Sequence, residues 1–216
     1  MRAALLGLLL ALLLAGAACG GGDDDGEPSA AGDGECESVE APDPRDPEQR
    51  EEPSEPLDAG TSYALVFETS CGSFTIALDV AQAPNTSASL VTLAQDGYFD
   101  DTTFHRVVPN FVIQGGDPTA QGSGGPGYKT VDAPPADATY VKGVVAMAKT
   151  EFEPPGTSGS QFFVVTGEDI QLPADYAIVG EVSEGIETID RINALGVSDG
   201  PPSQPVNIET VTVEES

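Results

Sequence analysis

Residues 104–117 read FHRVVPNFVIQGGD, and they place one arginine, two phenylalanines and one glutamine within a short apolar segment. Side chains alternate between the two faces of a β-strand, so an extended segment from Phe111 to Gln114 presents an aromatic and an amide side chain on opposite faces. A bend at Pro109 brings Arg106 near both. An isolated cation is costly to bury among apolar groups, so this stretch alone is equally consistent with a surface arginine at a strand end.

Three further segments carry related patterns. They read VVAMAK at residues 144–149, GTSGSQFFVV at residues 156–165 and LPADYAIVG at residues 172–180. Together with residues 104–117 they resemble four signature segments of the cyclophilin family of peptidyl-prolyl cis-trans isomerases, in the family's order and with similar spacing. One short motif is weak evidence, but four in register are specific. The resemblance covers about residues 61–214.

The chain from residue 61 onward has the pattern of an all-β domain. Residues 63–69 and 74–79 predict a hairpin, and two amphipathic helices are expected from Pro84 to about Gln95 and over about 184–194. Further strands are expected near residues 111–115, 143–148, 161–166, 176–182 and 205–213. Many short strands with only two helices favour a barrel or a sandwich. The resemblance implies a closed eight-stranded antiparallel β-barrel capped by the two α-helices.

The N-terminus predicts an export signal over residues 1–18. Arg2 precedes an apolar run that is shorter than the roughly 20 residues of a membrane span, which is typical of a signal peptide. Residues 16–19 read GAAC and resemble a bacterial lipobox, with Gly16 where an aliphatic residue is usual. Cys19 is therefore the predicted lipidation site of an extracytoplasmic bacterial lipoprotein. Ordinary cleavage near Ala18, which would give a secreted protein, remains the alternative.

Residues 19–60 are crowded with Asp, Glu, Pro and Gly, and we predict a disordered tether ahead of a domain at residues 61–216. Such a composition buries too little apolar surface to offset the entropy of ordering. If Cys19 is acylated, Cys36 and Cys71 are the two cysteines that remain, and they could pair with each other. An exported protein permits a disulfide between them, and two unpaired thiols are the alternative.

The charge and the composition exclude some classes of partner. The formal net charge of −28 argues against a nucleic-acid partner, because phosphate binding needs clustered Lys and Arg. Three cysteines and one histidine without a short Cys-x-x-Cys spacing predict no metal site. We expect no cofactor, proline-containing polypeptides as clients, membrane contact only through an N-terminal lipid anchor, and a monomer.

The resemblance also implies the site residues. Arg106 takes the position of the family's catalytic arginine, accompanied by Gln114, Phe111 and His105. The implied substrate-binding residues are Val112, Met147, Ala148, Lys149, Gln161, Phe163, Leu172 and Tyr176. We interpret Phe104 and Phe162 as ordinary core residues. This chain departs from the best-known eukaryotic members by having Val112 for Met, Lys149 for Asn, Gln171 for Trp and Tyr176 for His.

Prolyl isomerisation suits such a site because it makes and breaks no covalent bond. Its barrier of roughly 18–20 kcal/mol arises from lost amide resonance, so a donor that stabilises the twisted amide is sufficient for catalysis. We therefore predict a peptidyl-prolyl isomerase for exported or cell-surface polypeptides, with Arg106 as that donor. A non-catalytic chaperone or adaptor that binds proline-containing segments is the alternative. A hydrolase would have to use His105, and Arg106 beside it disfavours the required imidazolium.

Overall fold

The computed structural model describes residues 34–216, so the predicted signal peptide at 1–18 and Cys19 lie outside the described residues. The elements, in chain order, are β1 (Tyr63–Thr69), β2 (Phe74–Leu78), α1 (Pro84–Gln95), β3 (Thr102–Thr103), β4 (Arg106–Val108), β5 (Val112–Gly115), β6 (Thr130–Val131), β7 (Val144–Met147), β8 (Thr157–Ser158), β9 (Phe162–Val165), β10 (Ile178–Glu184), α2 (Ile186–Ala194) and β11 (Asn207–Glu215). The predicted hairpin and both predicted helices are confirmed. Within the described part of the chain, no helix is long and apolar enough to cross a membrane.

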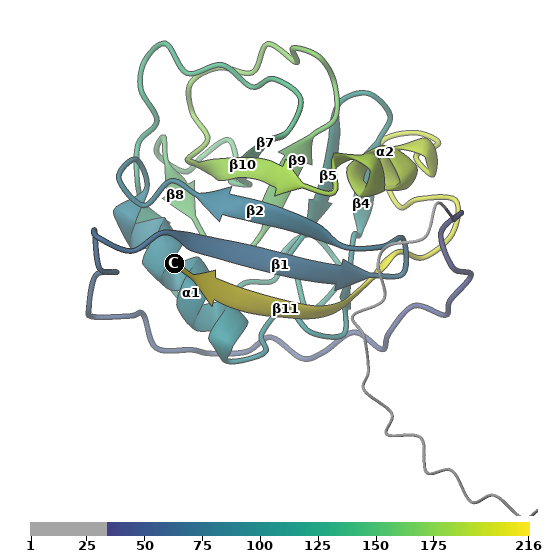
Figure 1. The fold of residues 1–216 in the computed structure, drawn as a ribbon, viewed down its shortest axis with the longest axis horizontal. Helices are drawn as coiled ribbons and strands as arrows, with labels where there is room; N and C mark the ends of the chain where they lie inside the picture. Colours follow the sequence, from purple (N-terminus) through teal and green to yellow (C-terminus); the bar gives the residue numbers. More distant parts are fainter. Residues whose placement is uncertain (1–33) are drawn as a thin grey trace, which may run out of the picture. The chain divides into compact units, whose positions relative to one another are not determined.

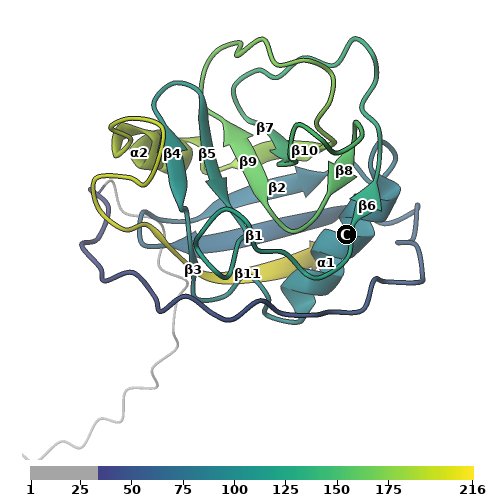
Figure 2. The same ribbon diagram turned by 180° about the vertical axis from the view of Figure 1, so that it is seen from behind.

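Nine strands form one curled antiparallel sheet in the order β3-β11-β1-β2-β10-β7-β9-β5-β4, and β6 pairs with β8 separately (Figures 1 and 2). The predicted eight-stranded closed barrel is corrected in two respects. The sheet has nine strands, and over residues 34–216 no ladder joins its edges β3 and β4. The reason is local: both edges belong to one segment, residues 102–108, which pairs with β11 at its start and with β5 at its end.

The two helices lie toward opposite ends of the curled sheet in Figure 1. Helix α1 begins at Pro84, where a proline costs no hydrogen bond because the first helical N–H groups have no partner in the helix. The side chain that caps this helix comes from a distant loop: the Asp132 carboxylate accepts hydrogen bonds from Thr86 N at 2.7 Å and Thr86 Oγ1 at 2.6 Å. A carboxylate at this end also favours the helix dipole.

Strands β5, β7 and β9 are buried on both faces, and this places the site. On the inner face, Ile113, Met147 and Phe162 join the main core. On the outer face, Val112 and Phe163 join a second, smaller cluster. That cluster also holds or touches residues of the loops, namely Phe111, Tyr140, Ala148, Ile170, Leu172 and Tyr176. The sheet thus carries a shallow apolar layer on its outside, at the predicted substrate site.

Residues 34–62, which we call the strap, contain no helix or strand but follow the surface of the domain. Their backbone N–H groups donate to domain carbonyls, from Glu37 to Ser70 at 2.7 Å and from Arg50 to Pro126 at 2.7 Å. The described part of the predicted tether therefore contacts the domain. The composition gave no indication of this, because these bonds involve the backbone rather than apolar side chains.

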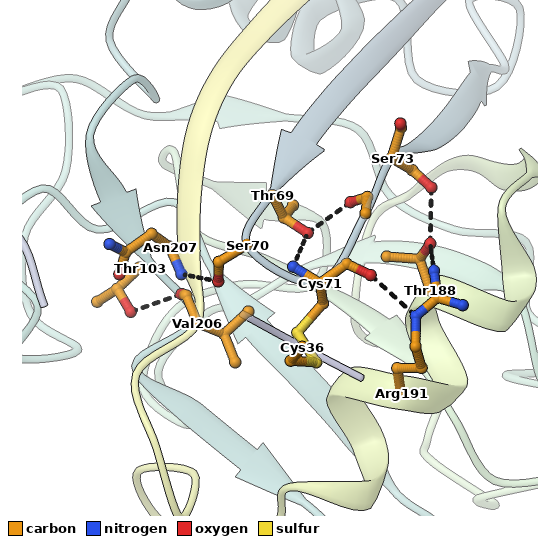
Figure 3. Close-up of a disulfide and its surroundings, with 11 residues drawn as sticks. Cys36, Thr69, Ser70, Cys71, Ser73, Thr103, Thr188, Arg191, Val206 and Asn207 are labelled. Carbon is orange, nitrogen blue, oxygen red and sulfur yellow. Dashed lines mark hydrogen bonds between the residues drawn. A yellow bond between two sulfur atoms is a disulfide. The ribbon is translucent and has the colours of Figure 1, made fainter. Parts of the chain in front are cut away.

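A disulfide between Cys36 and Cys71 holds the start of the strap to the β1–β2 hairpin (Figure 3). The hairpin is itself tied to helix α2, because Arg191 Nε donates to the carbonyl of Cys71 at 2.9 Å. Further along, the guanidinium carbons of Arg45 and Arg50 lie 5.8 and 5.7 Å from the ring centroid of Tyr98. Covalent and cation–π contacts thus fix the strap at separate points along its length.

Candidate active site

Arg106 and Gln114 lie opposite each other because the register of the antiparallel β4–β5 pair places them so. Arg106 Nη1 donates to Gln114 Oε1 at 3.2 Å, and Gln114 Nε2 donates to Gln161 Oε1 at 3.0 Å. Gln161 Nε2 then donates to the carbonyl of Gly124 at 2.9 Å. Each amide accepts with its oxygen and donates with its nitrogen, so this relay fixes the orientation of both glutamines from the guanidinium outward.

The other edge of the Arg106 guanidinium faces Asp199, in the loop between α2 and β11. Nε donates to Asp199 Oδ1 at 2.6 Å and Nη2 to Oδ2 at 3.1 Å. The hydrogen bonds and the charge of Arg106 lower the pKa of Asp199 below its ordinary value. The guanidinium carbon also lies 6.0 Å from the ring centroid of Phe111. Asp199 was missed by the sequence analysis, since its Gly- and Pro-rich loop matches no motif.

A pocket of about 290 Å³ opens beside Arg106 on the outer face of the sheet. Its lining consists of Arg106, Phe111, Val112, Gln114, Ala148, Lys149, Phe163, Leu172 and Tyr176. Every one of these residues was implied by the resemblance, and the structure brings them together from β4, β5, β9 and three loops. The pocket therefore combines an apolar floor with two cationic side chains, Arg106 and Lys149, and one amide.

Tyr176 is held against the pocket by aromatic contacts and by its backbone. Its ring meets the Phe163 ring edge-on, with centroids 5.6 Å apart. The hydroxyl of Tyr140 donates to the carbonyl of Tyr176 at 2.8 Å and accepts from its N–H at 3.1 Å. Burial raises the pKa of Tyr140. Tyr140 supports the pocket wall from behind, a role that its sequence context did not indicate.

Lys149 lines the pocket, yet its ammonium group is engaged elsewhere. The side chain is only 3% exposed, and Nζ lies 3.4 Å from an Asp175 carboxylate oxygen. Nζ also donates to the carbonyls of Thr150 at 3.2 Å and Glu153 at 3.1 Å, and it lies 5.5 Å from the Tyr176 ring centroid. Lys149 therefore braces the following loop, and its charge is satisfied by the protein itself.

A second pocket of about 140 Å³ adjoins the first, and the two share Gln114, Ala148 and Lys149 in their linings. Gln161 lies here, together with Gly124 and with Thr150 and Glu153 of the loop that Lys149 braces. Because they share these lining residues, the two pockets form one continuous groove.

The family whose description reads cyclophilin type peptidyl-prolyl cis-trans isomerase/CLD matches residues 64–213. The chain belongs to this family. The predicted enzyme class, a peptidyl-prolyl cis-trans isomerase, is thereby confirmed. Among the described residues of this cyclophilin, no group of three or more His, Cys, Asp or Glu side chains could hold a metal ion.

Proteins with similar sequences also carry names of peptidyl-prolyl cis-trans isomerases. Peptidyl-prolyl cis-trans isomerase-like 1 of Aspergillus oryzae is 38% identical over 157 residues, which are 70% of this chain and 96% of that protein. Probable peptidyl-prolyl cis-trans isomerase B of Mycobacterium leprae is 34% identical over 75% of this chain and 59% of its own length. The relatives thus include fungal and bacterial proteins, and they give no support to the predicted bacterial, exported lipoprotein.

Two solved structures of a cyclophilin type isomerase have a similar fold. The crystal structure of a Cryptosporidium parvum cyclophilin type isomerase resembles this cyclophilin with a TM-score of 0.65 and 28% identity, over 71% of this chain and 98% of that one. A second structure of that protein, obtained in the presence of the dipeptide Ala-Pro, gives a TM-score of 0.64 and 29% identity.

Two residues implied by the resemblance do not line either pocket of this cyclophilin. Met147 is fully buried in the main core, because side chains alternate along β7 and only Ala146 and Val144 reach the outer cluster. His105, which precedes Arg106 in the chain, is not part of either pocket lining. Its two ring nitrogens are buried and have no partner among the described residues.

The surroundings of His105 also argue against a hydrolase. Burial lowers its pKa, with the nearby Asp117 acting in the opposite direction and the Arg106 charge adding to the decrease. The histidine of a Ser-His-Asp triad must accept the proton of a serine, carry it as an imidazolium and then pass it to the leaving group. Neither ring nitrogen has a hydrogen-bond partner within residues 34–216, so the described structure assembles no such triad.

Proposed function

We propose that this cyclophilin binds an X-Pro segment in its groove and that Arg106 stabilises the twisted amide. The observation that carries the proposal is the guanidinium at the edge of the 290 Å³ apolar pocket. A proline ring held by Phe111, Phe163 and Leu172 brings its nitrogen to the polar edge. Arg106 and Gln114 lie at that edge, where charge develops as the amide loses resonance.

The proposed catalysis needs only selective binding of the transition state. As the C–N bond rotates, the prolyl nitrogen gains a lone pair that can accept a hydrogen bond, which the planar amide cannot offer. A fixed N–H donor of Arg106 binds that state more strongly than either ground state, which is how an enzyme lowers a barrier. Gln114, held by Gln161, binds the substrate carbonyl or keeps the guanidinium in place.

The substrate class is supported by the Cryptosporidium parvum relative, whose second structure was obtained in the presence of Ala-Pro. For this chain we propose proline-containing polypeptides as clients and a monomer as the working form. We also propose export, with residues 1–18 as signal peptide and Cys19 as lipid anchor of a bacterial lipoprotein. The Cys36–Cys71 disulfide fits this location, because disulfides persist mainly in oxidising compartments.

A protease-coupled assay tests the activity directly. The protease cleaves only the trans form of an Ala-Pro-Phe peptide, so an isomerase accelerates the slow phase, which uncatalysed takes tens of seconds. We expect acceleration that is proportional to the amount of protein and is lost in Arg106→Ala. Binding of the peptide without any acceleration would make this chain a non-catalytic module that binds proline-containing segments.

A further inference from the structure

The ion pair between Arg106 and Asp199 is the closest polar contact in the site. Asp199 lies outside residues 104–117, the sequence motif that contains Arg106. It joins β4 to a loop 93 residues further along the chain, with bonds of 2.6 and 3.1 Å. Asp199 is 68% exposed and Arg106 is 30% exposed. Exposed ion pairs contribute little to stability, so folding alone does not account for this one.

The geometry leaves a defined set of donors free. A guanidinium has five N–H groups: one on Nε and two on each terminal nitrogen. Asp199 takes the Nε hydrogen and one Nη2 hydrogen, and Gln114 takes one Nη1 hydrogen. Two donors therefore remain, one on Nη1 and one on Nη2. With one partner on each side, the guanidinium can neither rotate about its own axis nor swing out of the site without breaking bonds.

The backbone places Asp199 beside Arg106 independently of its side chain. The neighbouring Gly200 carbonyl accepts a hydrogen bond from Val107 N at 2.8 Å, and Ser203 N donates to the Leu195 carbonyl at 2.8 Å. The loop therefore stays next to β4 when the carboxylate is removed. A substitution at Asp199 tests the carboxylate alone.

We propose that Asp199 is a positioning residue for Arg106. Its carboxylate accepts two hydrogen bonds from one edge of the guanidinium and thereby orients the two remaining donors toward the bound X-Pro amide. The inference rests on the proposed role of Arg106. Preorganised donors act in the transition state because no reorientation is needed as charge develops. Loss of the two hydrogen bonds to Asp199 reduces the fraction of bound substrate that meets a correctly oriented donor. This loss lowers kcat more than it changes KM.

The test compares Asp199→Ala and Asp199→Asn with the wild-type full chain in the protease-coupled assay. We expect Asp199→Ala to lower kcat about fivefold to tenfold with KM changed less than twofold. Asn keeps one acceptor oxygen, so Asp199→Asn should fall between the two. Asp190→Ala is the matched control, because it removes another exposed ion pair, with Lys142 at 2.6 Å, away from the pocket linings. It should leave kcat unchanged.

A spectroscopic measurement separates positioning from a general structural effect. In ¹⁵N NMR spectra, the Nε–H signal of Arg106 should exchange slowly with water in the wild type. It should exchange faster in Asp199→Ala and remain slow in Asp190→Ala. The signal is assigned by its absence in Arg106→Ala.

Two outcomes overturn the proposal: a kcat of Asp199→Ala equal to or above that of the wild type, or an unchanged exchange rate of the Arg106 Nε–H. Arg106→Ala is measured in parallel. If that variant is fully active, the proposed mechanism fails. If it is inactive while Asp199→Ala is unimpaired, only the positioning role fails.

Discussion

Arg106 and Gln114 are direct cross-strand partners on β4 and β5, and their side chains are joined by a hydrogen bond of 3.2 Å. The side chains of facing residues in an antiparallel pair lie on the same side of the sheet. The guanidinium and the amide therefore reach the same pocket as a consequence of register. A shift of the register by one residue would send one of them to the other face.

Arg106→Ala should lower kcat/KM by about 10²-fold or more, which is the usual loss of one preorganised donor. The fold should survive because the side chain is 30% exposed and lies at the edge of the pocket. The assay is the protease-coupled one, with circular dichroism as the check on folding. Arg106→Lys should recover little, since a single ammonium cannot serve Asp199 and Gln114 and still present a fork of donors. Near-full activity in a folded Arg106→Ala variant would contradict the mechanism.

Gln114→Ala should lower kcat/KM by a smaller factor, about fivefold to 20-fold. The variant loses the acceptor for Arg106 Nη1 and the donor for Gln161 Oε1 in one step. The guanidinium keeps its contact with Asp199, so catalysis is weakened rather than abolished. Steady-state kinetics measure the effect, and Gln161→Ala, which breaks the relay one position further from Arg106, should cost less. A larger loss in Gln161→Ala than in Gln114→Ala would show that the relay does not act through Arg106.

The sequence could predict the hairpin, both helices and the pocket lining because local patterns and motif positions carry that information. Met147 lines neither pocket, and a motif does not state which face of a strand is outward. Its neighbour Ala146 pairs with Phe163, so the alternation of side chains along β7 turns Met147 to the inner face. Asp199 could not be predicted, because a contact across 93 residues between two unrelated segments leaves no local trace.

The strap could not be predicted for a different reason. Composition reports whether a segment can bury apolar side chains, and residues 34–62 bury few. Their contacts instead use backbone N–H groups, two arginines that stack on Tyr98, and a disulfide. The sequence predicted that Cys71 lies in a turn between two strands, but it did not predict that Cys36 comes close to it.

Replacing both Cys36 and Cys71 with Ser should destabilise the protein by about 2–4 kcal/mol, because the bridge closes a loop whose ends are 35 residues apart. Differential scanning calorimetry should show a lower Tm for this variant, and reduction of the wild type should lower Tm in the same way. Isomerase activity at 25 °C should remain, since no strap residue lines the 290 Å³ pocket. An unchanged Tm would mean that the strap detaches before the domain unfolds.

Asp117→Asn should reduce stability at pH 7 by about 1–3 kcal/mol. The fully buried carboxylate accepts bonds from Thr119 N and Oγ1, both at 2.8 Å, and from Gly124 N at 3.0 Å. Burial raises its pKa, but these bonds and the nearby His105 outweigh burial and hold the pKa below its ordinary value of 3.8.

A depressed pKa in the folded state fixes the pH dependence of this effect. The stabilisation by Asp117 is fully present above the unfolded pKa and is lost as pH falls through the lower folded pKa. The difference between wild type and Asp117→Asn should therefore be constant from about pH 5 to pH 7 and shrink below about pH 4. Urea unfolding at several pH values measures it. A difference that grows as the pH falls would contradict the assignment.

Phe152 should set a preference for clients with a large apolar residue near the proline. Its side chain is 89% exposed, and it projects from the loop that Lys149 braces. In that loop Thr150 N donates to Glu153 Oε2 at 2.7 Å, and Glu153 lies 3.0 Å from Lys129. Thr150 and Glu153, on either side of Phe152, line the 140 Å³ pocket. Phe152 itself lines neither pocket, so its exposed ring stands between two residues that do line the groove.

Phe152→Ser should raise KM about threefold to tenfold for a peptide with Leu or Phe close to the proline, because partial burial of an aromatic ring contributes about 1 kcal/mol. A matched peptide with Gly at that position has no side chain to meet the ring, so its KM should not change. Val131→Ser is the control, since Val131 is 54% exposed and neither of its chain neighbours, Thr130 and Asp132, lines a pocket. Equal effects of Phe152→Ser on both peptides would show that the ring acts on the shape of the groove and does not contact the client.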